Sequence, residues 1–165
     1  MPFAYYRRLN RAQQRIYQRS DEVTSIRLPY PVALDDPINN IARALESDDR
    51  RVVENACQRF AHAVTLSLKV APVRVEVMAA RPLRRGGELH GLYTQKQGGR
   101  PPTIAVWMRT AQRHQVVAFR TFMRTLIHEL CHHLDFELLA LQESFHTEGF
   151  YKRESSLVHQ SLRKE

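Results

Sequence analysis

Two histidines and a glutamate in the C-terminal half of the chain have the spacing of a metal-dependent hydrolytic centre. The sequence there reads His128-Glu129-Leu130-Cys131-His132. Histidines four residues apart lie about one full turn apart on an α-helix, so both rings can bind one Zn²⁺ from the same face. Glu129 can accept a proton from a water molecule that such a metal activates. The pattern therefore predicts a zinc-dependent centre with Glu129 as general base.

A catalytic zinc usually has three protein ligands and leaves a fourth position open, so a third ligand must come from elsewhere in the chain. His146 is separated from His132 by thirteen residues. That length allows the helix to end, the chain to turn and a side chain to return over the two histidines. We expect His146 to be the third ligand, and the carboxylates of Glu143, Glu148 and Glu154 are the alternatives.

Three other side chains near the motif are less suited to bind the metal. His133 is rotated about 140° from His128 on a helix, which favours a place on the helix surface or behind the ligands. Cys131 also lies off the ligand face, and we expect it to be buried in packing. Asp135 either orients a ligand histidine or faces solvent.

The motif requires a helix, and the apolar spacing between about residues 115 and 139 predicts one. Its apolar stripe consists of Val116, Phe119, Phe122 or Met123, Leu126, Ile127, Leu130 and Leu134. The same periodicity predicts helices at residues 4–20, about 36–46, about 49–68 and about 147–163.

The middle of the chain has the alternating pattern of strands. Residues 73–77 alternate apolar and charged side chains, and residues 88–94 and 103–108 are two more strand candidates. Residues 81–87 are predicted to be a basic turn or loop. The sequence therefore predicts an α+β fold, in which a small, three-stranded, mostly antiparallel sheet packs on helices that include the helix of the motif.

Composition is ordinary for a globular protein, with 43% hydrophobic and 25% charged residues among 165. We expect a basic helical arm and connector at residues 1–30 and one domain at residues 31–165. No apolar run approaches the roughly 18 residues that span a membrane, and the N-terminus has no secretory signal, which predicts a cytoplasmic protein without a membrane partner. With only Cys57 and Cys131, any zinc must be bound by histidine and carboxylate.

The formal net charge is +8, and residues 71–120 hold most of it, with nine basic and two acidic side chains. Such a surface, together with the first helix, favours a polyanion such as DNA, although a solvated basic face with no partner has the same pattern. The phosphate-binding candidates in this stretch are Arg81, Arg84, Arg85, Lys96, Arg100, Arg109 and Arg113.

The sequence around the motif resembles the SprT-like and WLM zinc metalloproteases. His128-Glu129-Leu130-Cys131-His132 and His146-Thr147-Glu148-Gly149-Phe150 are similar to the metal helix and the His-x-x-x-Phe element of these families, and Gly91-Leu92-Tyr93 and Ile104-Ala105-Val106-Trp107 are similar to the hairpin and strand before it. The resemblance covers about residues 70–160. Thr147 stands where these families often have glycine, and the Cys-rich zinc ribbon of many members is missing.

This resemblance implies a zincin-like metallopeptidase domain that binds Zn²⁺ through His128, His132 and His146 and acts on protein or peptide substrates, including proteins associated with DNA. We expect an extended substrate to add a strand at a sheet edge formed by residues 88–94 or 103–108. The alternatives are a nucleic-acid-binding protein with a structural zinc, whose fourth ligand would be Glu143, Glu148 or His133, and a zinc hydrolase that acts on nucleic acid. Tyr93 and Tyr151 are either donors to the reacting carbonyl oxygen or packing residues.

Overall fold

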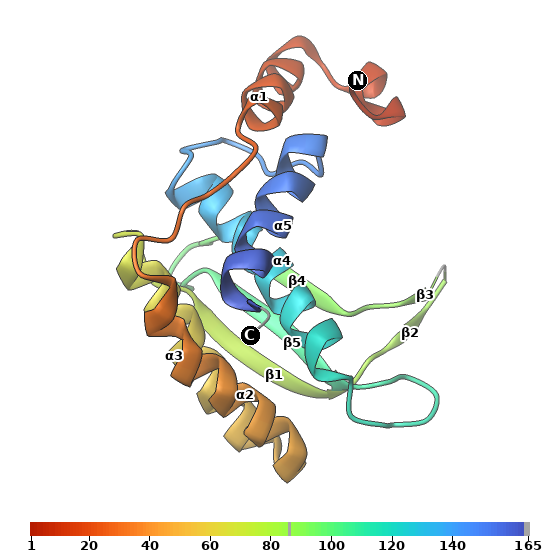
Figure 1. Ribbon diagram of the computed structural model, residues 1–165. Coiled ribbons are helices and arrows are strands. Elements are labelled where there is room, and N and C mark those ends of the chain that lie inside the picture. The colour runs from red at the N-terminus through yellow and green to blue at the C-terminus, as the bar shows by residue number, and fades with distance from the viewer. Residues whose placement is uncertain (86, 164–165) are drawn as a thin grey trace.

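A computed structural model describes residues 1–85 and 87–163, and in this part of the chain the fold is α+β (Figure 1). The α-helices are α1 (Arg11–Glu22), α2 (Asp35–Ser47), α3 (Arg50–Ser67), α4 (Phe119–Glu137) and α5 (Glu148–Ser161), and the 3-10 turns are η1 (Ala4–Arg8) and η2 (Pro31–Leu34). The main sheet contains β1 (Arg74–Ala80), β4 (Gly91–Thr94) and β5 (Thr103–Arg109), and β2 (Leu83–Arg84) and β3 (Gly87–Glu88) form a short hairpin. The expected fold class is therefore confirmed at the level of α+β.

The main sheet is mixed, which corrects the expectation of a mostly antiparallel sheet. The strand order is β1-β5-β4, and β5 pairs with β1 in parallel and with β4 in antiparallel orientation. The chain between β1 and β5 passes through the β2–β3 hairpin and through β4, so β5 enters the sheet in the same direction as β1. A prediction from alternation alone does not contain this order, because parallel and antiparallel strands can share one pattern.

One face of the sheet carries the core. Val75 and Val77 of β1 and Ile104 and Val106 of β5 are buried, whereas their neighbours along each strand are partly or fully exposed. These side chains share one apolar cluster with residues of α2, α3 and α4. The alternation predicted for β1 thus gives a sheet with helices on one side.

The two edges of the sheet differ. Gln58 of α3 donates from Nε2 to the carbonyl oxygen of Val73 (3.0 Å) and accepts from the backbone N–H of Val75 (2.8 Å). The carboxylate of Glu54 accepts from the N–H of Val77 (3.0 Å). Side chains of α3 therefore occupy the free edge of β1, and β4 is the edge on the side of α4.

Helix boundaries differ from the predicted ones where a capping side chain or a bond to a strand takes the backbone N–H groups that the helix would use. The predicted helix at residues 4–20 is interrupted at Asn10, whose side chain accepts from the N–H of Gln13 while the Gln13 side chain accepts from the N–H of Asn10. Helix α4 begins at Phe119 rather than near residue 115, because the N–H of Val117 donates to the carbonyl of Met108 at 2.7 Å. Residues 81–87 include short strands where a turn was predicted.

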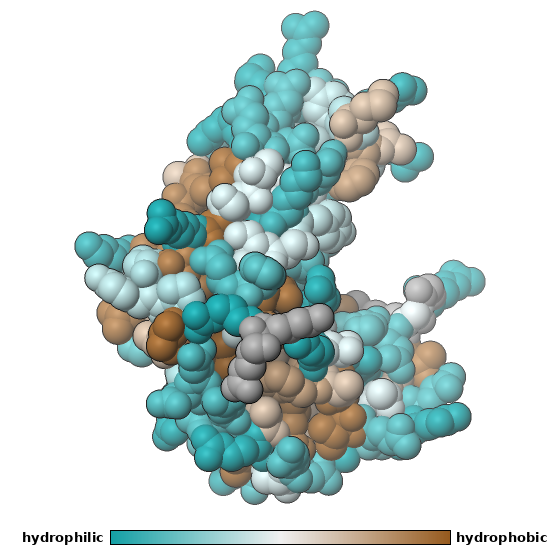
Figure 2. Space-filling model, viewed as in Figure 1, coloured by the Kyte–Doolittle hydropathy of each residue, from teal (hydrophilic) through white to brown (hydrophobic). Residues whose placement is uncertain are grey.

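The N-terminal arm docks against the beginning of α5 (Figure 1). The hydroxyls of Ser20 and Thr147 lie 3.2 Å apart, and the carboxylate of Asp21 accepts from the N–H of Gly149 at 2.8 Å. Figure 2 shows a recess between this arm and the β2–β3 hairpin. Within the described residues, no helix is long and apolar enough to cross a bilayer.

Gly149 marks the closest approach of the arm to α5, which predicts the effect of a substitution. A Cβ atom at Gly149 would lie 2.5 Å from the carbonyl oxygen of Asp21 and 2.7 Å from that of Ser20, and backbone atoms can move little. We expect Gly149→Ala to lower the free energy of unfolding by about 1–3 kcal/mol in urea denaturation. Gly99→Ala is the control, because a Cβ atom there meets nothing within 4 Å. Equal stability of the two variants would contradict the prediction.

Candidate metal centre

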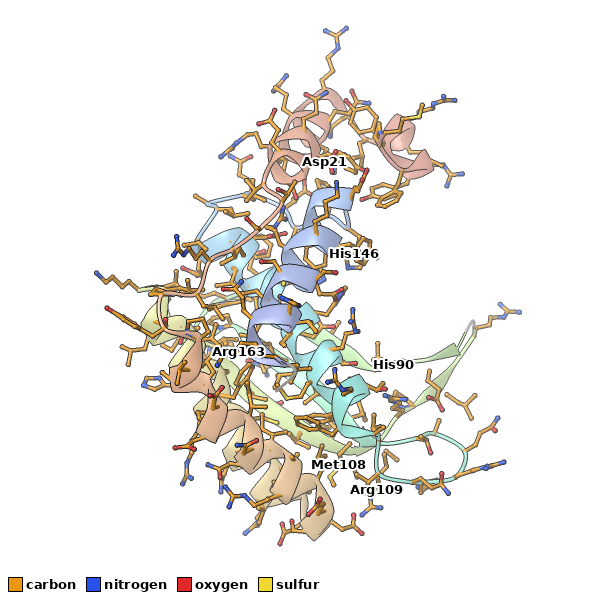
Figure 3. All side chains as sticks on the ribbon, viewed as in Figure 1. Asp21, His90, Met108, Arg109, His146 and Arg163 are labelled. Carbon is orange, nitrogen blue, oxygen red and sulfur yellow. The ribbon has the colours of Figure 1, made fainter. Side chains whose placement is uncertain are left out.

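Three histidines converge above the middle of α4. His128 and His132 lie one turn apart on this helix, and His146 lies in the loop before α5 (Figure 3). The Nε2 atom of His146 is 3.1 Å from that of His128 and 3.0 Å from that of His132. Ligands about 2.0–2.1 Å from a tetrahedral zinc are about 3.3 Å apart, close to these separations. The structure thus brings together the three histidines predicted from the sequence, near enough to bind one metal ion.

Hydrogen bonds to Nδ1 determine which nitrogens of two of these rings are free. The Nδ1 atom of His128 lies 2.6 Å from a carboxylate oxygen of Glu154, so this nitrogen carries the proton. Ser144 donates to Asp135 (2.7 Å), so its oxygen accepts from Nδ1 of His132 (2.7 Å). Both Nε2 atoms then present lone pairs toward the same point. Two lone pairs that converge beside the Nε2 atom of His146 fit a shared cation, and the donor set of three histidines fits Zn²⁺.

Burial and the nearby charges act on the protonation of these rings. Burial, together with the positive charges of His128 and His146, lowers the pKa of His132 to about 3. The pKa of His146 is lowered mainly by burial as well. Burial also lowers the pKa of His128, but the hydrogen bond to Glu154 and the charge of Glu129 outweigh it, so the net shift is upward. Two of the three rings are therefore neutral at pH 7, as metal ligands must be.

Glu129 lies beside this cluster and is buried, with 6% of its surface exposed. Burial raises its pKa to about 7, against the opposing effects of the His128 charge and the backbone N–H of Tyr93. The carboxylate borders two hollows, one of about 250 Å³ that includes His90 and one of about 450 Å³ that includes His146. His90 and His146 are both visible on the concave side in Figure 3. The carboxylate is therefore partly desolvated yet reachable from both hollows.

The other residues considered as ligands are engaged elsewhere. Glu154 bonds the outer nitrogen of His128, Glu148 pairs with Lys152 at 3.0 Å, and Glu143 accepts from Gln13 at 3.4 Å. In the part of the chain that the structure describes, the group close enough to share a metal consists of the three histidines alone.

His133 and Cys131 both belong to the core. His133 is fully buried rather than on the helix surface, and its ring nitrogens bond the hydroxyl of Tyr93 (2.9 Å) and the carbonyl of Ala71 (2.7 Å). Cys131 is buried as expected. Tyr93 is therefore a packing residue that links β4 to α4, whereas the ring of Tyr151 lies 5.6 Å from that of His146 and is 40% exposed.

A buried polar chain lies behind His132. Asp135 is buried rather than solvent-facing, so of its two predicted roles it has that of orienting a ligand histidine, although it acts through Ser144; the part that Arg153 plays was not predicted. Arg153 of α5 is fully buried and donates to Asp135 at 3.0 Å, and Asp135 accepts from Ser144, which contacts His132. Arg153 also donates to the carbonyl of Val23 at 2.6 Å, and so connects the N-terminal arm to the candidate metal centre. In the sequence, Arg153 lies on the apolar stripe of α5, between Phe150 and Leu157, and this position could have indicated that its side chain is buried.

The basic residues predicted to contact phosphate divide into two groups. Arg81 is buried and pairs with Glu88 at 3.1 Å, and Arg109 pairs with Asp48, so both are used within the fold. Exposed members are Arg85, Lys96, Arg100 and Arg113, with Arg7, Arg8, Arg11, Arg15 and Arg19 on the arm. The side chain of Arg84 lies outside the described part of the structure.

Comparison with known proteins gives no match for this chain, whether to a protein-family model, a curated protein or a solved structure.

Proposed function

We propose that this protein is a zinc-dependent metallopeptidase with a zincin-like, SprT-like catalytic domain. The observation that carries the proposal is the convergence of the Nε2 atoms of His128, His132 and His146 beside the buried carboxylate of Glu129. Three protein ligands leave a tetrahedral ion one open position, which is the arrangement of catalytic rather than structural zinc. The proposed fourth ligands of a structural site, Glu143, Glu148 and His133, are held elsewhere, which favours the enzyme over that alternative.

Glu129 acts as the general base in this proposal. His128, His132 and His146 would hold the zinc, which would supply Lewis-acid polarisation of the scissile carbonyl and make water more acidic. Glu129 accepts the proton of the attacking water and delivers it to the nitrogen of the leaving amine. A carboxyl group whose pKa lies near 7 can serve in both steps at neutral pH. Glu154 and Ser144 hold the rings of His128 and His132 in position.

The substrate is proposed to pair with β4. Because β5 is the central strand, the alternative of residues 103–108 as the edge is wrong. The edge of β1 is filled by α3, whereas Gly91, Leu92 and Tyr93 of β4 border the hollow that contains the histidines. An extended peptide that adds to β4 by backbone hydrogen bonds would place its scissile bond over the metal centre.

Substrates associated with nucleic acid fit the charge of the protein. The exposed arginines of the arm lie on the element that docks beside His146, since the hydroxyl of Tyr5 donates to the His146 carbonyl at 2.5 Å. A DNA-bound protein could therefore be held near the centre by phosphate contacts to the arm.

A proteolysis assay on the full chain tests the proposal. We expect cleavage of an unfolded protein substrate that stops on chelation and returns when Zn²⁺ is restored, with one equivalent of zinc per chain. Assays with and without DNA show whether a polyanion stimulates the reaction. Stoichiometric zinc without cleavage in either condition would favour the structural-zinc alternative.

The close packing of Gly91 against Glu129 predicts that a substitution at Gly91 slows the reaction. A Cβ atom there would lie 2.9 Å from a methyl carbon of Thr125 and 3.0 Å from an oxygen of Glu129, so the carboxylate must shift. We expect Gly91→Ala to lower kcat about 10-fold, because small displacements of a catalytic group are costly. Zinc content should remain unchanged. Gly99→Ala is again the control, and an unaltered kcat for Gly91→Ala would contradict the packing argument.

A further inference from the structure

A pocket lined by basic side chains lies between the beginning of α4 and the end of α5. It has a volume of about 740 Å³ and is lined by Arg120, Arg124, Ser155, Val158, His159, Leu162 and Arg163. Helices α4 and α5 run in opposite directions here, since Glu154 meets His128 and Arg153 meets Asp135 nearer the other ends of the two helices. The pocket therefore lies on the side of His128 that faces away from His146 and the N-terminal arm.

Arg124 connects this pocket to the proposed catalytic centre. It also lines the 250 Å³ hollow that contains His128 and Glu129. Arg120, Arg124 and His128 follow at intervals of four residues, so they occupy one stripe of α4, and each step covers about 6 Å along the helix. A guanidinium one or two turns from His128 is within reach of a group two to four residues away from a scissile bond in an extended peptide, at about 3.3 Å per residue.

The electrostatics of the pocket favour an anion. Its lining contains three arginines and a histidine, and none of its described lining residues is acidic. Arg163 is partly neutralised by Asp35 at 2.8 Å, and Figure 3 shows it extending from the end of α5. Within residues 1–85 and 87–163, neither Arg120 nor Arg124 has an ion pair. Helix α4 begins without a side-chain cap and without an acid in its first turn, which adds positive potential beside Arg120.

We propose that this pocket is a substrate subsite that binds a carboxylate of the peptide, supplied by a glutamate or aspartate side chain or by the C-terminus. The inference rests on the proposed peptidase function and adds a specificity to it. Val158 and Leu162 line the pocket together with the arginines, which suits a short aliphatic stem that ends in an acid. Arginine binds carboxylates through paired N–H donors, which gives the site directional preference.

The pocket fits a peptide better than a nucleic acid. Its cationic groups form one local group, and Arg124 of this group also lines the hollow that contains Glu129. A nucleic-acid backbone instead requires charges spread along a path of several phosphates. The exposed arginines at residues 7–19 are spread along the arm in that way, and they lie near the opposite end of the α4–α5 pair.

The test is a set of fluorogenic peptides in which each position on both sides of the cleaved bond carries glutamate or glutamine in turn. Matched peptides that end in a carboxylate or an amide separate a C-terminal acid from a side-chain acid. At low salt we expect one position within four residues of the bond, or the free C-terminus, to favour the acid about 3- to 10-fold, chiefly through KM. Arg120→Gln and Arg124→Gln should each reduce this preference to less than about 2-fold, and added salt should weaken it.

Arg51→Gln is the control, because Arg51 is an exposed arginine on α3 far along the chain from both helices. It should keep the wild-type preference, and thermal unfolding of all three variants checks that the fold is retained. Cleavage without any acid preference would overturn this inference and leave the peptidase proposal intact, whereas no zinc-dependent cleavage of any peptide would overturn both. If Arg120→Gln and Arg124→Gln instead weaken binding of a DNA oligonucleotide and leave peptide preference unchanged, the pocket binds phosphate and the inference is wrong.

Discussion

Glu129→Gln is expected to lower kcat/KM for a peptide substrate by about 10²–10⁴-fold while the chain keeps its zinc. The amide has nearly the same shape as the carboxylate but cannot accept a proton from the attacking water. The Nε2 atoms of the proposed metal site belong to other side chains, so the proposed ligand set stays complete. The loss should appear in kcat rather than in KM, because in the proposed mechanism Glu129 acts on the reacting atoms and not on the bound peptide.

Glu148→Gln is the matched control for this variant. Glu148 lies two residues after His146, and its exposed carboxylate pairs with Lys152. We expect the amide variant to keep both zinc and activity. Metal content of both proteins is measured by elemental analysis, and cleavage is measured under identical conditions. Retained zinc-dependent cleavage by Glu129→Gln would exclude Glu129 as the base. Loss of zinc from Glu148→Gln would instead show that Glu148 takes part in binding the metal.

The part of the site that lies within one helix could be predicted from the sequence. His128, Glu129 and His132 are placed by the geometry of α4, whose apolar stripe is apparent in the amino-acid sequence, and the structure keeps them on one face. His146 was a weaker prediction, because its return to the helix depends on a loop. The structure brings it within 3.1 Å of both partners.

The groups that hold these histidines could not be predicted in the same way. Glu154 was considered as a ligand, but in the structure it bonds the outer nitrogen of His128, 26 residues away in the chain. Ser144 has no sequence signal, since its role depends on a contact between a loop and Asp135. The parallel pairing of β1 with β5 is likewise a property of strand order, which local alternation does not encode.

The buried ion pair of Arg153 and Asp135 predicts the largest effect on stability. Both side chains are fully buried, and removal of one leaves an uncompensated charge in the core. We expect Arg153→Leu to lower the free energy of unfolding by about 3–5 kcal/mol, a large fraction of the roughly 5–15 kcal/mol of a typical domain. Burial already raises the pKa of Asp135 against the effect of Arg153, so loss of the arginine should raise that pKa further.

The double variant Arg153→Leu/Asp135→Asn distinguishes the cost of leaving one charge unpaired from the cost of replacing each buried side chain. If the cost arises from an unpaired charge, the double variant should be more stable than the sum of the two single changes predicts, by about 1–3 kcal/mol in urea denaturation. Zinc affinity gives a second measurement, because Asp135 orients Ser144 and Ser144 orients His132. We expect both single variants to bind zinc about 10- to 100-fold more weakly, as is usual when the partners of a ligand histidine are removed. Additive stability changes together with unaltered zinc affinity would mean that the Arg153 chain neither forms a coupled pair nor supports the metal centre.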